Sequence, residues 1–264
     1  MTRPITPARF VLALAVLLCA AAFATSSFAQ TPTPTPPPQA FQVAIVQVKP
    51  EMGREWREYL QNDANPAQVK AGVKRRDTLT TATFGEAGEY VLVQPIESLA
   101  HFDDNAVSQA LGPDGYQALL AKRARLINGS RSFVLTARPE LGFAPAPGYQ
   151  TKLMVSSTST VVPGHVAEFL KHAKEFAAVM AKTNAKGMLV GQVGLGGNPN
   201  EFVTIALFDS FADLANFPAA YAKAAADAKL GPAPAGVVAN TEWRVYRFVP
   251  ELSIGTAPQK TEKK

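Results

Sequence analysis

The stretch Pro139-Glu140-Leu141-Gly142-Phe143, near the middle of the chain, returns close to its end as Pro250-Glu251-Leu252-Ser253-Ile254. Three further pairs of blocks match in the same order and at nearly the same separation. They are Glu97-Ser98-Leu99-Ala100 with Asp209-Ser210-Phe211-Ala212, Glu89-Tyr90-Val91 with Glu201-Phe202-Val203, and Pro50, Glu55 and Trp56 with Pro163, Glu168 and Phe169. A nearly constant shift indicates two copies of one unit of about 105 residues, which is the size of a domain and too long for a solenoid repeat.

Each unit is predicted to fold in the order βαββαβ, from its hydrophobic periods and turn residues. In the first unit these elements are Phe41–Lys49, Glu51–Val69, Thr78–Phe84, Glu89–Pro95, a helical stretch from Leu99 that Gly112–Gly115 breaks before Tyr116–Ile127, and Ser130–Ala137. In the second unit they are Gln150–Val161, Gly164–Thr183, Gly187–Leu195, Glu201–Phe208, Ser210–Ala228 and Thr241–Val249. This order predicts an α+β protein of two tandem ferredoxin-like units, at residues 41–143 and 149–252.

Two such units, with their sheets packed face to face, resemble the dimeric α+β barrel superfamily fused in one chain. The resemblance covers Phe41 to Leu252 and concerns element order and unit length. It implies an intramolecular α+β barrel. A monomer is favoured, because the tandem already supplies the pairing that single-unit relatives obtain by dimerising, and a higher assembly through the outer helices is the alternative. Families with this fold include cofactor-free antibiotic-biosynthesis-type monooxygenases, EthD-like and NIPSNAP-like proteins, and the haem-binding chlorite dismutase group. Fold by itself does not carry function between them.

The N-terminal segment Met1–Ala29 has the zones of a secretory signal peptide. Arg3 and Arg9 give a positive start, Phe10–Ala24 is an unbroken apolar run, and Ser27-Phe28-Ala29 offers a cleavage site. The run of about 15 residues is shorter than the roughly 20 residues that span a bilayer. We therefore expect cleavage, a periplasmic or secreted location, and no integral membrane span in the mature chain. Residues 30–40 are predicted to be a Pro/Thr-rich extended linker, and residues 253–264 a disordered tail.

The composition excludes several classes of site. The single cysteine, Cys19, lies in the predicted signal peptide, so the mature chain has no disulfide and no thiolate metal ligand. The net charge of +5 falls to +3 without Arg3 and Arg9, which is too mild for a nucleic-acid-binding surface. The basic runs Lys74-Arg75-Arg76 and Lys122–Arg125 are interpreted as solvated helix ends or loops.

Two pairs of rings are the candidate pocket residues. His172 lies in an apolar helical stripe, three positions after Phe169, and Tyr59 follows Trp56 in the same way in the first unit. Both pairs are expected to face the space between helix and sheet, which in the resembled superfamily holds the ligand. The alternative is that these rings are core residues, with each polar tip bonded to backbone.

The remaining motifs are interpreted as structural. His101 and His165 are expected at solvated helix starts, and Gly191–Gly197 belongs to a hairpin rather than a phosphate loop, because no helix N-terminus follows it. Ser156–Thr160 (SSTST) is a hydroxyl-rich strand that faces either the barrel interior or water at a sheet edge. The sequence contains no HExxH or GxSxG motif and no carboxylate pair, so no metal site is predicted.

Three functions remain open. The first is an exported binding or structural module that takes a small apolar ligand and needs no cofactor. The second is a cofactor-independent, monooxygenase-like enzyme for a small apolar or aromatic substrate, which needs only an apolar pocket and a few polar groups. The third is haem binding, with His172 as axial ligand.

Overall fold

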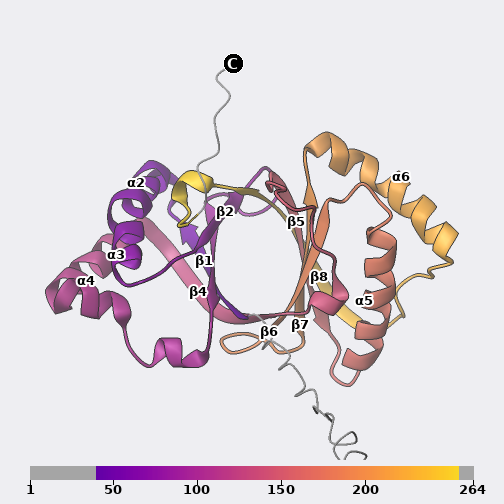
Figure 1. The fold of residues 1–264 in the computed structure, drawn as a ribbon, viewed down its shortest axis with the longest axis horizontal. Coiled ribbons are helices and arrows are strands. Elements are labelled where there is room, and N and C mark those ends of the chain that lie inside the picture. Colours follow the sequence, from indigo (N-terminus) through magenta and orange to yellow (C-terminus); the bar gives the residue numbers. More distant parts are fainter. Residues whose placement is uncertain (1–39, 256–264) are drawn as a thin grey trace, which may run out of the picture. The chain divides into compact units, whose positions relative to one another are not determined.

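Eight antiparallel strands close into a barrel within residues 40–255, the part of the chain that the computed structural model describes (Figure 1). Around the barrel they follow the order β1-β3-β2-β8-β5-β7-β6-β4. Their bounds are Ala40–Val48 (β1), Asp77–Thr81 (β2), Glu89–Ile96 (β3), Ile127–Ala137 (β4), Leu153–Val161 (β5), Gly187–Val193 (β6), Glu201–Phe208 (β7) and Val238–Phe248 (β8). The predicted signal peptide (1–29), all but the last residue of the predicted linker, and residues 256–264 lie outside the described residues.

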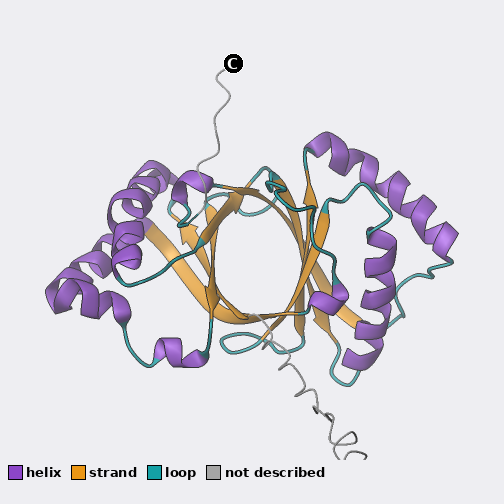
Figure 2. Ribbon diagram, viewed as in Figure 1, coloured by secondary structure: helices purple, strands orange, loops and turns teal. Residues whose placement is uncertain are grey.

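The helices lie outside the barrel on two opposite sides (Figure 2). Beside β1–β4 lie α2 (Gly53–Tyr59), α3 (Asn65–Lys70) and α4 (Ala106–Leu126), which together make the first half. Beside β5–β8 lie α5 (Val166–Met180) and α6 (Phe211–Ala228), which make the second half. The predicted α+β class and the closed barrel are confirmed, and each half orders its strands alike, as β4-β1-β3-β2 and β8-β5-β7-β6.

The barrel interior is filled by side chains. One buried apolar or aromatic residue from each strand joins a single cluster that contains no helix residue: Val43, Leu79, Val91, Phe133, Met154, Val193, Leu207 and Tyr246. Because strand residues alternate between two faces, the neighbouring positions point outward and pack under the helices. The opening that the ribbons of Figure 2 suggest is therefore a packed core rather than a channel.

A π-helical turn, Leu60–Ala64, joins α2 to α3. Pro66 follows it and has no N–H to donate to the carbonyl four positions earlier, which weakens regular helix at this point. The N–H of Asn65 instead donates to the carbonyl of Leu60, five positions back, which is the hydrogen bond of a π-helix. In α4, Gly112 makes the predicted break with a φ of 75°.

The two repeated PEL blocks each form a 3-10 turn that packs on the opposite half. We name Arg138–Phe143 the central clasp and Val249–Ile254 the C-terminal clasp. Leu141 of the central clasp is buried in the core beneath α5, whereas Leu252 of the C-terminal clasp is buried with Trp56 in the core of the first half. Each clasp also makes an isolated β-bridge, Phe143 with Met188 and Ile254 with Arg76.

Several sequence predictions need correction. Ser253 and Ile254, placed in the disordered tail, belong to the C-terminal clasp, and Ile254 is buried. Asn128 and Gly129, which the sequence left between the predicted helix Tyr116–Ile127 and the strand Ser130–Ala137, lie in β4, where Gly129 is paired with Gln47. Ser156–Thr160 is not at an edge, because β5 pairs with both β7 and β8. No helix within residues 40–255 is long and apolar enough to cross a bilayer.

Candidate functional site

Trp56 and Tyr59 lie between the first half's helix and its sheet, as predicted, but they pack there as core residues. Only 1% of Trp56 and 3% of Tyr59 is exposed. The indole lies 5.4 Å from the Tyr59 ring and 5.9 Å from the ring of Tyr90, which it meets edge to face. Burial raises the pKa of the Tyr59 hydroxyl, and nearby Asp63 raises it further, whereas Arg123 and Arg76 lower it. A ligand role for these rings stays a prediction.

Phe169 and His172 lie in the second half and do not meet the first pair. The Phe169 ring lies 4.7 Å from Phe202 in a small separate core cluster. His172 is partly buried on α5. The structure thus places the two predicted pairs in equivalent helices, but not in one site.

The layer beneath α5 and α6 is filled by aromatic rings, which bears on haem binding at His172. Phe217 lies 5.5 Å from Phe208 and 5.8 Å from Tyr221, which in turn lies 5.6 Å from Phe176. Met180 and Met188 join these rings in the same core, so the layer beneath α5 and α6 is closely packed. Haem binding at His172 stays a prediction, and this packing leaves little room for a porphyrin within the layer.

We therefore expect that adding hemin to the purified protein gives the broad absorption of free hemin and no sharp Soret band. His172→Ala should give the same spectrum as the unchanged protein. A sharp Soret band that disappears in His172→Ala would instead establish axial ligation.

The remaining histidines and the glycine-rich hairpin lie where they were predicted. His101 and His165 are exposed, and the His165 ring lies 3.1 Å from the carboxylate of Glu168 on the same helix. Gly191 lies in β6, and the following glycines form the turn to β7. Among the described residues, no three His, Cys, Asp or Glu side chains gather as a metal site.

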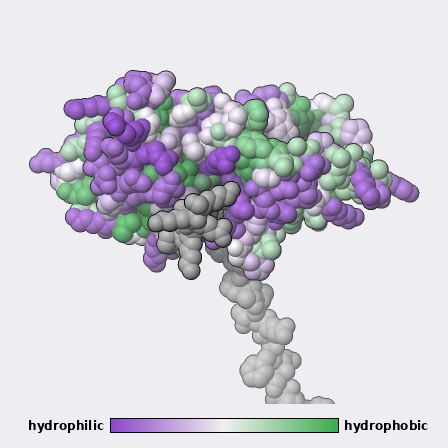
Figure 3. Space-filling view, turned by 90° about the horizontal axis from the view of Figure 1, so that it is seen from above, coloured by the Kyte–Doolittle hydropathy of each residue, from purple (hydrophilic) through white to green (hydrophobic). Residues whose placement is uncertain are grey.

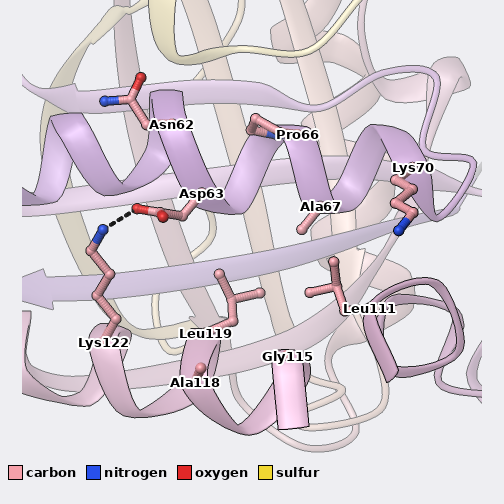
Figure 4. A pocket seen from close by; sticks show the side chains of 10 residues that line it. All are labelled: Asn62, Asp63, Pro66, Ala67, Lys70, Leu111, Gly115, Ala118, Leu119 and Lys122. Carbon is pink, nitrogen blue, oxygen red and sulfur yellow. Dashed lines mark hydrogen bonds and ion pairs between the residues drawn. The ribbon is translucent and has the colours of Figure 1, made fainter. Parts of the chain in front are cut away.

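An open groove of about 400 Å³ lies between the α3 helix and α4 (Figure 4). Leu111 and Leu119 point into it from α4, and Ala67 faces them from α3. Asp63 and Lys122 form an ion pair across one end, and Lys70 lies at the other end. The full lining is Asn62, Asp63, Pro66, Ala67, Lys70, Leu111, Gly115, Ala118, Leu119 and Lys122.

Sequence reasoning missed this groove because its lining comes from two helices whose facing sides only the tertiary structure reveals. The predicted helix Glu51–Val69 is recognised by its apolar stripe, whereas the groove is also lined by Asn62, Asp63 and Pro66, which lie outside that stripe. Seen from above, the face over the first half is mostly hydrophilic (Figure 3).

Arg76 is buried, which corrects the interpretation of Lys74-Arg75-Arg76 as a solvated run. Lys74 and Arg75 are exposed, but only 5% of Arg76 is. Its Nη2 donates to the side-chain oxygen of Asn65 on α3, and burial lowers the pKa of its guanidinium to about 10. The sequence signal was available, because the shift that aligns Glu89 with Glu201 also aligns Arg76 with Met188, a core position.

A second buried polar group lies inside the barrel and is fully paired. The Tyr246 hydroxyl donates to the Glu89 carboxylate at 2.6 Å, and Arg244 Nε lies 3.6 Å from the same oxygen. Burial and the contact with Glu89 raise the pKa of Tyr246. With its hydrogen bonds satisfied, this group stabilises the barrel core rather than offering a free donor.

No model of a known protein family matches the chain, and no curated protein matches its sequence. Among solved structures it is similar to a candidate monooxygenase from Lactobacillus acidophilus NCFM, with a TM-score of 0.53 and 10% identity over 82% of this chain and 96% of that one. An anthrone oxidase-like protein matches with a TM-score of 0.52 and 9% identity over 80% and 91% of the two chains. A mutant chlorite dismutase from Candidatus Nitrospira defluvii matches with a TM-score of 0.51 and 10% identity over 81% and 92%. At these identities the likeness concerns the fold, which is that of the dimeric α+β barrel proteins.

Proposed function

We propose that this protein is an exported module that binds a small apolar molecule in the groove between α3 and α4. The groove is the observation that carries the proposal. Its volume of about 400 Å³ lies within the range of small-molecule pockets, about 300–1,000 Å³. Export is supported by the signal-peptide pattern of residues 1–29.

The lining of the groove suits an apolar ligand with one polar end. Leu111, Leu119 and Ala67 present apolar surface along its length (Figure 4). The Asp63–Lys122 ion pair closes one end, so both of these charges are already satisfied. Lys70 at the other end forms no ion pair among the described residues and can meet a hydrogen-bond acceptor.

Filling the groove tests the proposal. Ala118 is exposed on α4 and lines the groove, so Ala118→Trp puts an indole into the space without opening the core. With the neutral fluorescent probe N-phenyl-1-naphthylamine, we expect saturable binding to the unchanged protein and binding at least about tenfold weaker, or about 1.4 kcal/mol, in Ala118→Trp. Fluorescence titration measures both.

The matched control is Ala226→Trp, which adds the same side chain at an exposed position on α6. It should bind the probe as the unchanged protein does. Equal binding by both variants, or no saturable binding to the unchanged protein, would refute the groove as the site.

The enzymatic alternative is an oxygenase-like reaction, and the matched monooxygenase and anthrone oxidase-like structures carry names of that kind. The groove favours binding instead. Asp63 is the carboxylate in its lining, and it is paired with Lys122 rather than free to act as a base.

We also propose that each half is a ferredoxin-like unit and that the barrel arose by fusion of two copies. The equal strand order of the halves supports this, as do the equivalent β-bulges at Gln47/Val48 and Thr160/Val161. Because β2–β8 and β4–β6 pairing closes the barrel within one chain, we expect a monomer, which sedimentation can test.

A further inference from the structure

Arg76 is a buried cation without an acidic partner among the described residues. Its one side-chain hydrogen bond goes to the neutral amide of Asn65, and Tyr59 is the group that interacts with it electrostatically. Its Nε is buried and has no acceptor among residues 40–255. Charged side chains are almost never buried unless they are paired, because removing a charge from water is costly.

The second half shows that the fold does not need a charge at this position. Met188 occupies the equivalent place. It forms an isolated β-bridge with Phe143 of the central clasp, just as Arg76 does with Ile254 of the C-terminal clasp. The backbone hydrogen bonds correspond, at 2.9 and 2.9 Å for Met188 and at 3.1 and 2.8 Å for Arg76. Met188 is 1% exposed in an apolar core, so an apolar side chain satisfies this position in the second half.

Two buried donors of the first half, Arg76 Nε and the Trp56 indole N–H, lack an acceptor among the described residues. The side-chain oxygen of Asn65 accepts a hydrogen bond from Arg76, and its Nδ2 donates to the carbonyl of Leu252 at 3.0 Å. The amide is therefore held in one orientation. In the same helix–sheet layer the Trp56 indole N–H is buried and has no acceptor among the described residues. An anion that accepts hydrogen bonds is the group that complements this layer.

We propose that Arg76 binds the carboxylate of a small organic acid in the helix–sheet layer of the first half. A carboxylate is planar and accepts the paired N–H groups of a guanidinium edge, and its charge compensates the buried cation. The acid is small because Trp56, Tyr59 and Leu252 pack closely around this layer. This site is distinct from the α3–α4 groove, whose lining does not include Arg76.

Thermal unfolding of the full chain tests the site, with sodium acetate compared against sodium chloride at equal ionic strength. We expect acetate to raise the Tm of the unchanged protein further than chloride does, with a rise that saturates, because a ligand that binds only the folded state stabilises it. Equal Tm values in the two salts at every concentration would overturn the proposal without the use of any variant.

Arg76→Met, which copies the side chain of the second half, is the variant to compare. We expect it to lose the acetate-specific rise in Tm and to unfold, without acetate, at a temperature equal to or above that of the unchanged protein. It should still bind N-phenyl-1-naphthylamine in the groove, which separates the two sites. An acetate response that survives in Arg76→Met would assign the effect to another place and overturn the proposal.

If Arg76→Met does not fold, isothermal titration calorimetry of the unchanged protein, with acetate and with inorganic phosphate, tests the proposed site instead. Saturable acetate heat that phosphate does not displace supports a planar carboxylate site. If acetate gives no binding heat, or if phosphate at equal concentration displaces bound acetate, the proposal is overturned.

Discussion

Replacing Trp56 with alanine is expected to lower the free energy of unfolding by about 3–5 kcal/mol, the usual cost of removing a buried aromatic side chain. Trp56 is among the largest fully buried side chains and packs against Tyr59 and Tyr90. Its indole N–H has no acceptor among the described residues, so the loss comes from packing rather than from a broken hydrogen bond. Urea unfolding followed by far-UV circular dichroism measures the change.

The chain offers a matched control, because the only other tryptophan, Trp243, is 67% exposed on β8. Trp243→Ala should change the free energy of unfolding by no more than about 0.5 kcal/mol. A loss below about 1 kcal/mol for Trp56→Ala would show that the indole is not a core residue. Ligand binding at Trp56, the other role that the sequence leaves open, would then be the better account.

Leu252→Ala is expected to cost about 2–5 kcal/mol, because it removes a fully buried side chain that joins the C-terminal clasp to the first half. The equivalent change in the central clasp, Leu141→Ala, should cost a similar amount, since Leu141 is 2% exposed beneath α5. The same denaturant titration measures both variants.

Glu251→Ala is the control within the C-terminal clasp. Its ion pair with Arg57 is 2.8 Å long but about half exposed at each side chain, so its loss should cost at most about 1 kcal/mol. A Leu252→Ala cost equal to that of Glu251→Ala would mean that the clasp is not part of the cooperative core.

The sequence predicts the barrel well because its signals are local or repeated. Alternation identifies strands such as Glu89–Ile96, and the shift between matched blocks identifies the two halves. The shift shortens by a single position between the Trp56–Phe169 match and the Glu89–Glu201 match, so the second unit holds one residue fewer in this interval. The π-helical turn at Leu60–Ala64 accounts for the additional residue of the first unit, since α5 is a regular helix.

What the sequence could not show depends on contacts between distant segments. The PEL blocks are recognisable as repeats, but nothing local indicates that each packs on the half it does not follow. Arg76 has the local sequence environment of a surface arginine, and its core position is marked only by distant segments: its alignment with Met188 and its bridge to Ile254. The groove likewise requires the relative placement of α3 and α4.

The exchanged clasps have a consequence for how the chain can be divided. A cut between Pro145 and Gly148 leaves an N-terminal fragment that carries the central clasp, which covers the core of the other fragment. The C-terminal fragment in turn carries Leu252, which completes the core around Trp56. Each fragment therefore lacks the clasp that completes its own core. The two fragments are suited to a split-protein pair that folds fully only when both are present.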